Sequence, residues 1–127
     1  MNLFRTLHIG DLHYWAVPRD PHAYLGKRFL GVANLLLKRR FKFPTAQAAP
    51  RVLARAAELR PDAVLFSGDF STTALPEEFA AAARALGAQP ALSGGIRAVP
   101  GNHDRYTESA RSELAFERHL AEPLAAP

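Results

Sequence analysis

Three short blocks of residue types that bind metals stand at the ends of apolar segments in this chain. Each block follows a run that predicts a β-strand, at residues 4–10, 63–67 and 96–100. Because the carboxyl ends of parallel strands meet at one edge of a sheet, we expect the blocks to converge there. Their carboxylate, imidazole and amide groups are ligands for divalent cations. The blocks are Asp11-Leu12-His13, Gly68-Asp69 and Gly101-Asn102-His103-Asp104.

Residue type and spacing within the blocks explain why each residue is a candidate metal ligand. Asp11 and His13 are two residues apart, so their side chains point the same way if the backbone stays extended. Asp69 follows a glycine, which lets the backbone turn toward an ion, and its carboxylate can bridge two cations. Asn102 offers a neutral amide oxygen, which adds no negative charge against a phosphate. The predicted metal ligands are therefore Asp11, His13, Asp69 and Asn102.

The chemistry that this ligand set predicts is hydrolysis of a phosphomonoester or phosphodiester. Two cations about 3.5 to 4 Å apart lower the pKa of a shared water to give hydroxide and offset the charge on the phosphoryl oxygens. His103, next to the ligand Asn102, is predicted to assist departure of the leaving oxygen. Asp104 is predicted to orient that imidazole. The mixed nitrogen and oxygen donors suit two ions of manganese, iron or zinc.

Segments with helical periodicity alternate with the predicted strands. Residues 51–59 place apolar side chains on one face and end before Pro61. Residues 76–86 begin with a proline and two acids, which favour the first turn of a helix. Residues 109–120 predict a last helix. This alternation predicts a single α/β domain over residues 1–127, with a mainly parallel sheet and flanking helices.

The three blocks and their surroundings resemble the first three motifs of the calcineurin-like metallophosphoesterases. The likeness is greatest to bacterial members grouped with cyclic-nucleotide phosphodiesterases, around residues 8–13, 60–69 and 99–104. The resemblance implies a sandwich of two sheets flanked by helices, and a cyclic nucleotide as the leading substrate. It implies a first metal held by Asp11, His13 and Asp69. It implies a second metal held by Asp69 and Asn102. It also implies that His103 with Asp104 serves the leaving group.

The chain departs from the family pattern after the third block. The family continues to a lone histidine and then to a Gly-His-x-His motif, whereas only His119 follows here, inside a predicted helix. We therefore expect the N-terminal half of a metallophosphoesterase domain, truncated, with sheet surface left open and prone to self-association. The alternative from another functional class is a catalytically inactive fragment or a metal-binding part of a larger assembly.

One segment interrupts the alternation of strands and helices. Residues 26–42 place apolar side chains at helical spacing and contain no acid, which predicts a basic amphipathic helix. A helix packed on the domain with solvated basic ends is the simpler interpretation. The alternative is a surface that docks on an anionic membrane or guides a phosphorylated substrate, with nucleic acid as a weaker prediction. The basic residues are Lys27, Arg28, Lys38, Arg39, Arg40 and Lys42.

Amino-acid composition limits the possible metal ligands and the expected location of the protein. The chain has 127 residues, no cysteine and a formal net charge of +4. Without cysteine, neither disulfides nor thiolate metal sites are available. The apolar N-terminus carries Arg5 and His8 and lacks a cleavage pattern, so we expect no signal peptide. No apolar run approaches the ~20 residues needed to cross a bilayer, and we expect a cytoplasmic protein.

Overall fold

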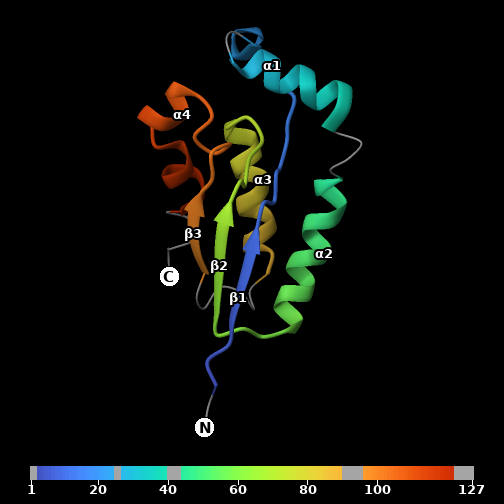
Figure 1. Cartoon of the computed structure of the whole chain (residues 1–127), viewed down its shortest axis with the longest axis vertical. Helices are drawn as coiled ribbons and strands as arrows, with labels where there is room; N and C mark the ends of the chain where they lie inside the picture. The colour runs from blue at the N-terminus through green and yellow to red at the C-terminus, as the bar shows by residue number, and fades with distance from the viewer. Residues whose placement is uncertain (1–2, 25–26, 40–43, 90–95, 122–127) are drawn as a thin grey trace.

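The described part of the chain folds as a three-stranded parallel sheet flanked by helices (Figure 1). The computed structural model describes residues 3–24, 27–39, 44–89 and 96–121. The strands are β1 (Thr6–Gly10), β2 (Ala63–Gly68) and β3 (Ile96–Pro100), in that order across the sheet. The predicted α/β class is confirmed. Within these ranges there is one sheet, so the second sheet that the family resemblance implies is not among the described residues.

Helices fill the connections between the strands. The 3-10 turn η1 (Pro21–Tyr24) precedes α1 (Lys27–Asn34), which continues into the π-helical turn η2 (Leu35–Arg39). α2 (Thr45–Glu58) leads into β2, and α3 (Pro76–Gly87) follows it. α4 (Glu108–Ser112) and the π-helical turn η4 (Glu117–Ala121) come after β3. In the ranges described, no helix is both long and apolar enough to span a membrane.

The predicted basic helix is present over the part of it that the structure describes. α1 and η2 together cover residues 27–39 of the predicted range 26–42. Gly26 and residues 40–42 lie outside the described residues.

The two faces of the sheet differ in burial. Val64 and Phe66 of β2 point into the core, with exposed fractions of 1% and 3%. Leu65 and Val99, on the other face, are 41% and 57% exposed. In Figure 1, α3 lies behind the sheet, and the strands face the viewer with no helix in front of them. The described helices therefore cover one face. The core on that side includes Leu53, Ala56, Phe79, Ala82, Leu86, Phe116 and Leu120.

α2 begins earlier than the sequence predicted. The structure starts it at Thr45, before Pro50, whereas the periodicity indicated a start after that proline. A proline inside a helix costs a backbone hydrogen bond. The helix tolerates this cost because Leu53 and Ala56 are buried in the core. The Thr45 hydroxyl also donates to the carbonyl oxygen of His13 at 3.0 Å, which ties the helix start to the first block.

The prediction of one continuous helix over residues 109–120 is wrong. The chain breaks at Leu114, which has a φ of 52°. On an unbroken helix of about 100° per residue, Ala110 and Phe116 would lie about 120° apart around the axis, too far for both to point at the middle of the core. The break lets both side chains become buried, and the Phe116 ring lies 5.6 Å from that of Phe70.

Glu78 holds the loop between β2 and α3 in place. Its side chain is fully buried, and its carboxylate accepts hydrogen bonds from the backbone N–H groups of Thr72, Thr73 and Leu75 at 3.2, 2.8 and 3.2 Å. It also accepts from the N–H of Ala16 at 3.1 Å. Burial raises the pKa of Glu78, and these hydrogen bonds act against that rise. One carboxylate thus joins the segment after the first block to the loop after the second.

We expect Glu78→Ala to lower the free energy of unfolding by about 3 kcal/mol, because it leaves several buried N–H groups without an acceptor. Glu77→Ala is the matched control, since Glu77 is exposed in the same helical turn. The control is expected to change stability by less than about 0.5 kcal/mol. Urea unfolding followed by circular dichroism measures both variants. Equal small losses would mean that Glu78 does not hold the loop.

Candidate metal centre

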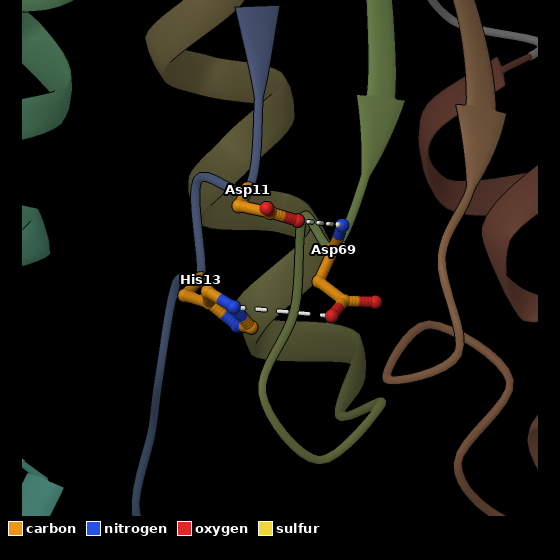
Figure 2. A group of neighbouring side chains, drawn as sticks. All are labelled: Asp11, His13 and Asp69. Atoms are coloured by element: carbon orange, nitrogen blue, oxygen red, sulfur yellow. Dashed lines mark hydrogen bonds and ion pairs between the residues drawn. The ribbon is translucent and has the colours of Figure 1, made fainter.

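Asp11, His13 and Asp69 form a cluster beyond the carboxyl ends of β1 and β2 (Figure 2). One ligand atom from each residue lies within 4.8 Å of the other two. Nε2 of His13 is 3.8 Å from Oδ2 of Asp69, and Oδ1 of Asp11 accepts a hydrogen bond from the Asp69 backbone at 3.2 Å. The structure therefore brings these three predicted ligands together. Asp69 is buried, His13 half-buried and Asp11 exposed, so the cluster is open to solvent on one side.

The backbone of the first block is not extended, which corrects the geometric reason for its pairing. Asp11 and His13 have φ values of 52° and 49°, in the left-handed region. Each such residue costs about 1 to 3 kcal/mol, and this strain is concentrated at functional sites. Leu12 between them is buried in the core, and the His13 N–H donates to the Asp69 carbonyl oxygen at 2.9 Å. The side chains of Asp11 and His13 meet because burial of Leu12 and the hydrogen bond to the second block stabilise this left-handed backbone.

The two carboxylate oxygens of Asp69 face different blocks. Oδ2 faces His13, as described above, whereas Oδ1 accepts a hydrogen bond from the backbone N–H of His103 at 2.8 Å. Gly101 makes this approach possible, because a Cβ there would overlap a carboxylate oxygen of Asp69. The Asp69 carboxylate therefore lies between the first and third blocks, and a hydrogen bond fixes it to the third.

The third block forms the turn after β3. Asn102 is exposed in that turn, and its place in the ligand set stays a prediction. Nδ1 of His103 lies 2.7 Å from the carbonyl oxygen of Thr72, and the ring stacks on Tyr106 with centroids 5.7 Å apart. Its centroid is 5.3 Å from the ring of His13. Because a carbonyl oxygen only accepts, Nδ1 carries the proton in this contact, and Nε2 is the ring nitrogen that the Thr72 carbonyl does not engage.

The prediction that Asp104 orients the imidazole of His103 is wrong. Asp104 is fully buried, and its carboxylate accepts from the backbone N–H groups of Phe70, Ser71 and Gly101 at 3.1, 2.8 and 3.0 Å. The Ser71 hydroxyl donates to it as well, at 2.8 Å. Burial raises the pKa of Asp104, and these donors act against that rise. Its carboxylate ties the loop after β2 to the turn after β3, so it positions the site through the backbone.

Two hollows flank the cluster. One of about 350 Å³ lies between the first block and α2, with Asp11 and His13 in its wall. The other, of about 250 Å³, lies between α1 and the third block. Tyr106 was missed by sequence reasoning, and its only signal was an aromatic residue close after the third block. The residues that line the second hollow are Leu30, Gly31, Asn34, Thr72, His103 and Tyr106.

The other histidines described lie away from this cluster. Nε2 of His8 is 2.5 Å from the hydroxyl oxygen of Ser67. His119 is exposed on η4, and its ring stacks on Phe79 with centroids 6.3 Å apart. His22 is exposed in η1. None of the three belongs to the group formed by Asp11 and its neighbours.

Comparison with known protein families identifies the family of this chain. The family model for the calcineurin-like phosphoesterases matches residues 4–126. The chain belongs to the calcineurin-like phosphoesterase family. Membership implies a hydrolase that acts on phosphate esters with bound divalent metal. No curated protein and no solved structure matches this chain.

The cluster fits the divalent cation that the phosphoesterase family implies. When both are ionised, the carboxylates of Asp11 and Asp69 repel each other, and a cation between them removes that repulsion. The third donor is the imidazole of His13, and this set of oxygen and nitrogen atoms is typical of sites for manganese, iron or zinc. The residues present therefore suit a metal ion at this edge of the sheet.

Proposed function

We propose that the chain is a phosphoesterase that cleaves a phosphomonoester or phosphodiester with two divalent ions. Asp11, His13 and Asp69 hold the first ion. Asp69 and Asn102 hold the second. Manganese, iron or zinc lowers the pKa of a water when bound and offsets the charge on the phosphoryl oxygens. The observation that carries the proposal is the position of Asp69, with one oxygen toward His13 and the other toward the third block.

His103 donates a proton to the leaving oxygen in this proposal. Its Nδ1 is fixed by the Thr72 carbonyl, and the ring lines the hollow of about 250 Å³. A protonated imidazole held in this way gives the Nε2 proton to the departing alkoxide. The alcohol part of the substrate then lies in the hollow, beside Tyr106 and Asn34. A cyclic nucleotide is the substrate that the sequence resemblance favours.

Hydrolysis of chromogenic esters tests this function. The purified chain is assayed with para-nitrophenyl phosphate, bis(para-nitrophenyl) phosphate and a cyclic nucleotide, before and after removal of metal with a chelator. We expect product release to stop on chelation and to return with manganese, iron or zinc. Release that continues unchanged in the chelated protein would refute a metal-dependent reaction.

A second candidate function is favoured by the open face of the sheet. Leu65 and Val99 are exposed on it, and apolar surface of this kind favours association. In that case the chain is a metal-binding part of a larger assembly, or a catalytically inactive fragment, rather than an independent enzyme. Sedimentation velocity tests whether the open face of the sheet drives association. A dimer that Val99→Ser dissociates would support self-association, and a monomer at every concentration would contradict it.

A further inference from the structure

The outward face of α1 and η2 carries large apolar side chains. Phe29 and Leu30 on α1 are 56% and 69% exposed, and Leu37 on η2 is 77% exposed. Val32 and Leu35 in the same segment are buried, with exposed fractions of 2% each. The segment is therefore apolar on two sides, and packing within the described residues uses only one of them.

The sequence segment that carries these apolar side chains has charges of one sign only. Between Asp20 and Glu58 the sequence contains no acid. Lys38 is exposed beside Leu37. Basic residues next to outward apolar side chains are typical of a helix that lies in the interface of an anionic membrane. A nucleic acid would use the charges and would leave the apolar side chains in water. The basic residues that bracket the apolar face in the sequence are Lys27, Arg28, Lys38, Arg39, Arg40 and Lys42.

The same helix borders the candidate metal centre. Leu30, Gly31 and Asn34 of α1 line the hollow of about 250 Å³. His103 and Tyr106 line it too. The packing is close, because a Cβ at Gly31 would come within 3.4 Å of the Tyr106 hydroxyl. Figure 1 shows α1 beyond the carboxyl ends of the strands, where the cluster lies. A surface that contacts the outer side of α1 therefore lies next to the opening of the site.

We propose that α1 and η2 form a docking face for anionic lipid membranes. The side chains of Phe29, Leu30 and Leu37 enter the boundary between headgroups and acyl chains, and Lys38 contacts the anionic headgroups. The docked protein lies on the membrane surface. Resting on the proposed function, this docking brings the hollow beside His103 to the headgroups, which favours a phosphate ester carried by a membrane lipid over the soluble cyclic nucleotide that the sequence resemblance suggests.

Co-sedimentation with vesicles tests the docking face. The purified chain is mixed with vesicles of phosphatidylcholine and phosphatidylglycerol in about a 2:1 ratio, at about 0.1 M salt. Vesicles of phosphatidylcholine alone are the comparison. We expect binding to the neutral vesicles to be at least about tenfold weaker, and binding to the anionic ones to fall when salt rises to about 0.5 M. Equal binding to both compositions overturns the proposal.

A charge-neutralised variant tests the basic residues. Lys38→Gln combined with Arg39→Gln and Arg40→Gln is expected to weaken binding to the anionic vesicles on the order of 100-fold. The control combines Arg51→Gln with Arg55→Gln, two exposed cations on α2. That control is expected to change binding less than about threefold. An equal loss in both variants would mean that net charge alone drives the binding, and would overturn a local docking face.

An apolar variant tests the other half of the face. Phe29→Ser combined with Leu37→Ser is expected to weaken vesicle binding on the order of tenfold. Both side chains are exposed, and circular dichroism checks that the fold is kept. Binding to duplex DNA that is tighter than vesicle binding and unaffected by this variant would assign the basic segment to nucleic acid. A dimer that this variant dissociates, in a chain that binds no vesicles, would assign the face to a second copy.

Vesicle binding and ester hydrolysis are measured separately, so that docking and the proposed function can fail independently. Hydrolysis of para-nitrophenyl phosphate in solution is expected to be unchanged in the Phe29→Ser and Leu37→Ser variant, although vesicle binding is lost. An active chain that ignores vesicles would overturn docking and leave the proposed function standing. A chain that binds vesicles and hydrolyses no ester would overturn the proposed function and leave docking standing. The lipid substrate class is overturned if a soluble phosphatidic acid analogue is not hydrolysed by the active chain.

Discussion

Replacing Gly101 with alanine is expected to abolish divalent cation binding and to lower the free energy of unfolding by about 3 kcal/mol. The new Cβ would overlap a carboxylate oxygen of Asp69 and come within 2.8 Å of the Asp69 backbone nitrogen. The turn cannot move away cheaply, because the Gly101 N–H donates to the buried carboxylate of Asp104 at 3.0 Å. Asp69 must therefore leave the position in which it faces both sides of the cluster.

Gly87→Ala is the matched control for this substitution. Gly87 is the last residue of α3, and a Cβ there meets nothing within 4 Å. Alanine in place of this glycine is expected to raise the free energy of unfolding by up to about 1 kcal/mol and to leave cation binding unchanged. Urea unfolding and manganese titration measure both variants. Normal manganese affinity in Gly101→Ala would contradict the close approach of the third block to Asp69.

Replacing His103 with alanine is expected to lower turnover about 100-fold to 10,000-fold, the range for loss of a general acid. In the proposed mechanism His103 supplies a proton and does not bind metal, so manganese affinity is expected to change less than about tenfold. Steady-state hydrolysis of an ester with a poor leaving group, such as an alkyl phosphate, shows the full loss. An ester of para-nitrophenol is expected to show a smaller loss, because that leaving group needs little protonation.

His22→Ala provides the comparison for His103. His22 is exposed in η1 and lies outside the cluster, so its loss is expected to change neither turnover nor metal affinity. A His103→Ala variant that loses manganese as completely as it loses turnover would show that His103 is a ligand. Equal losses for esters with good and poor leaving groups would contradict its role as the proton donor.

The strands and the meeting of the three blocks could be predicted because both depend on short-range pattern and simple topology. Apolar runs of strand length located β2 and β3 with an error of at most one residue, and β1 with an error of two residues at its start. Parallel strands then place their carboxyl ends along one edge. That rule is sufficient to bring Asp11 and His13 to Asp69, although it says nothing about the conformation of the chain around them.

The local geometry of the site could not be predicted, because it depends on contacts between residues far apart in the sequence. The left-handed conformation at Asp11 and His13 depends on burial of Leu12 and on pairing with the segment after β2. Asp104 accepts most of its hydrogen bonds from a loop more than thirty residues earlier, so its neighbour in the sequence was the wrong partner to choose. The stacking of Tyr106 on His103 has the same origin in tertiary packing.

Calorimetric titration of manganese into the wild-type chain and into Asp69→Asn tests most directly whether the cluster binds metal. Asparagine keeps the size of the side chain and one oxygen, but removes the negative charge and the second oxygen. The two-ion proposal predicts saturation at two ions per chain in the wild type, and binding at least about 100-fold weaker in Asp69→Asn. Asp20→Asn, an exposed carboxylate outside the cluster, is expected to bind as the wild type does. Equal manganese affinity in the wild type and in Asp69→Asn would contradict a metal centre built on Asp69.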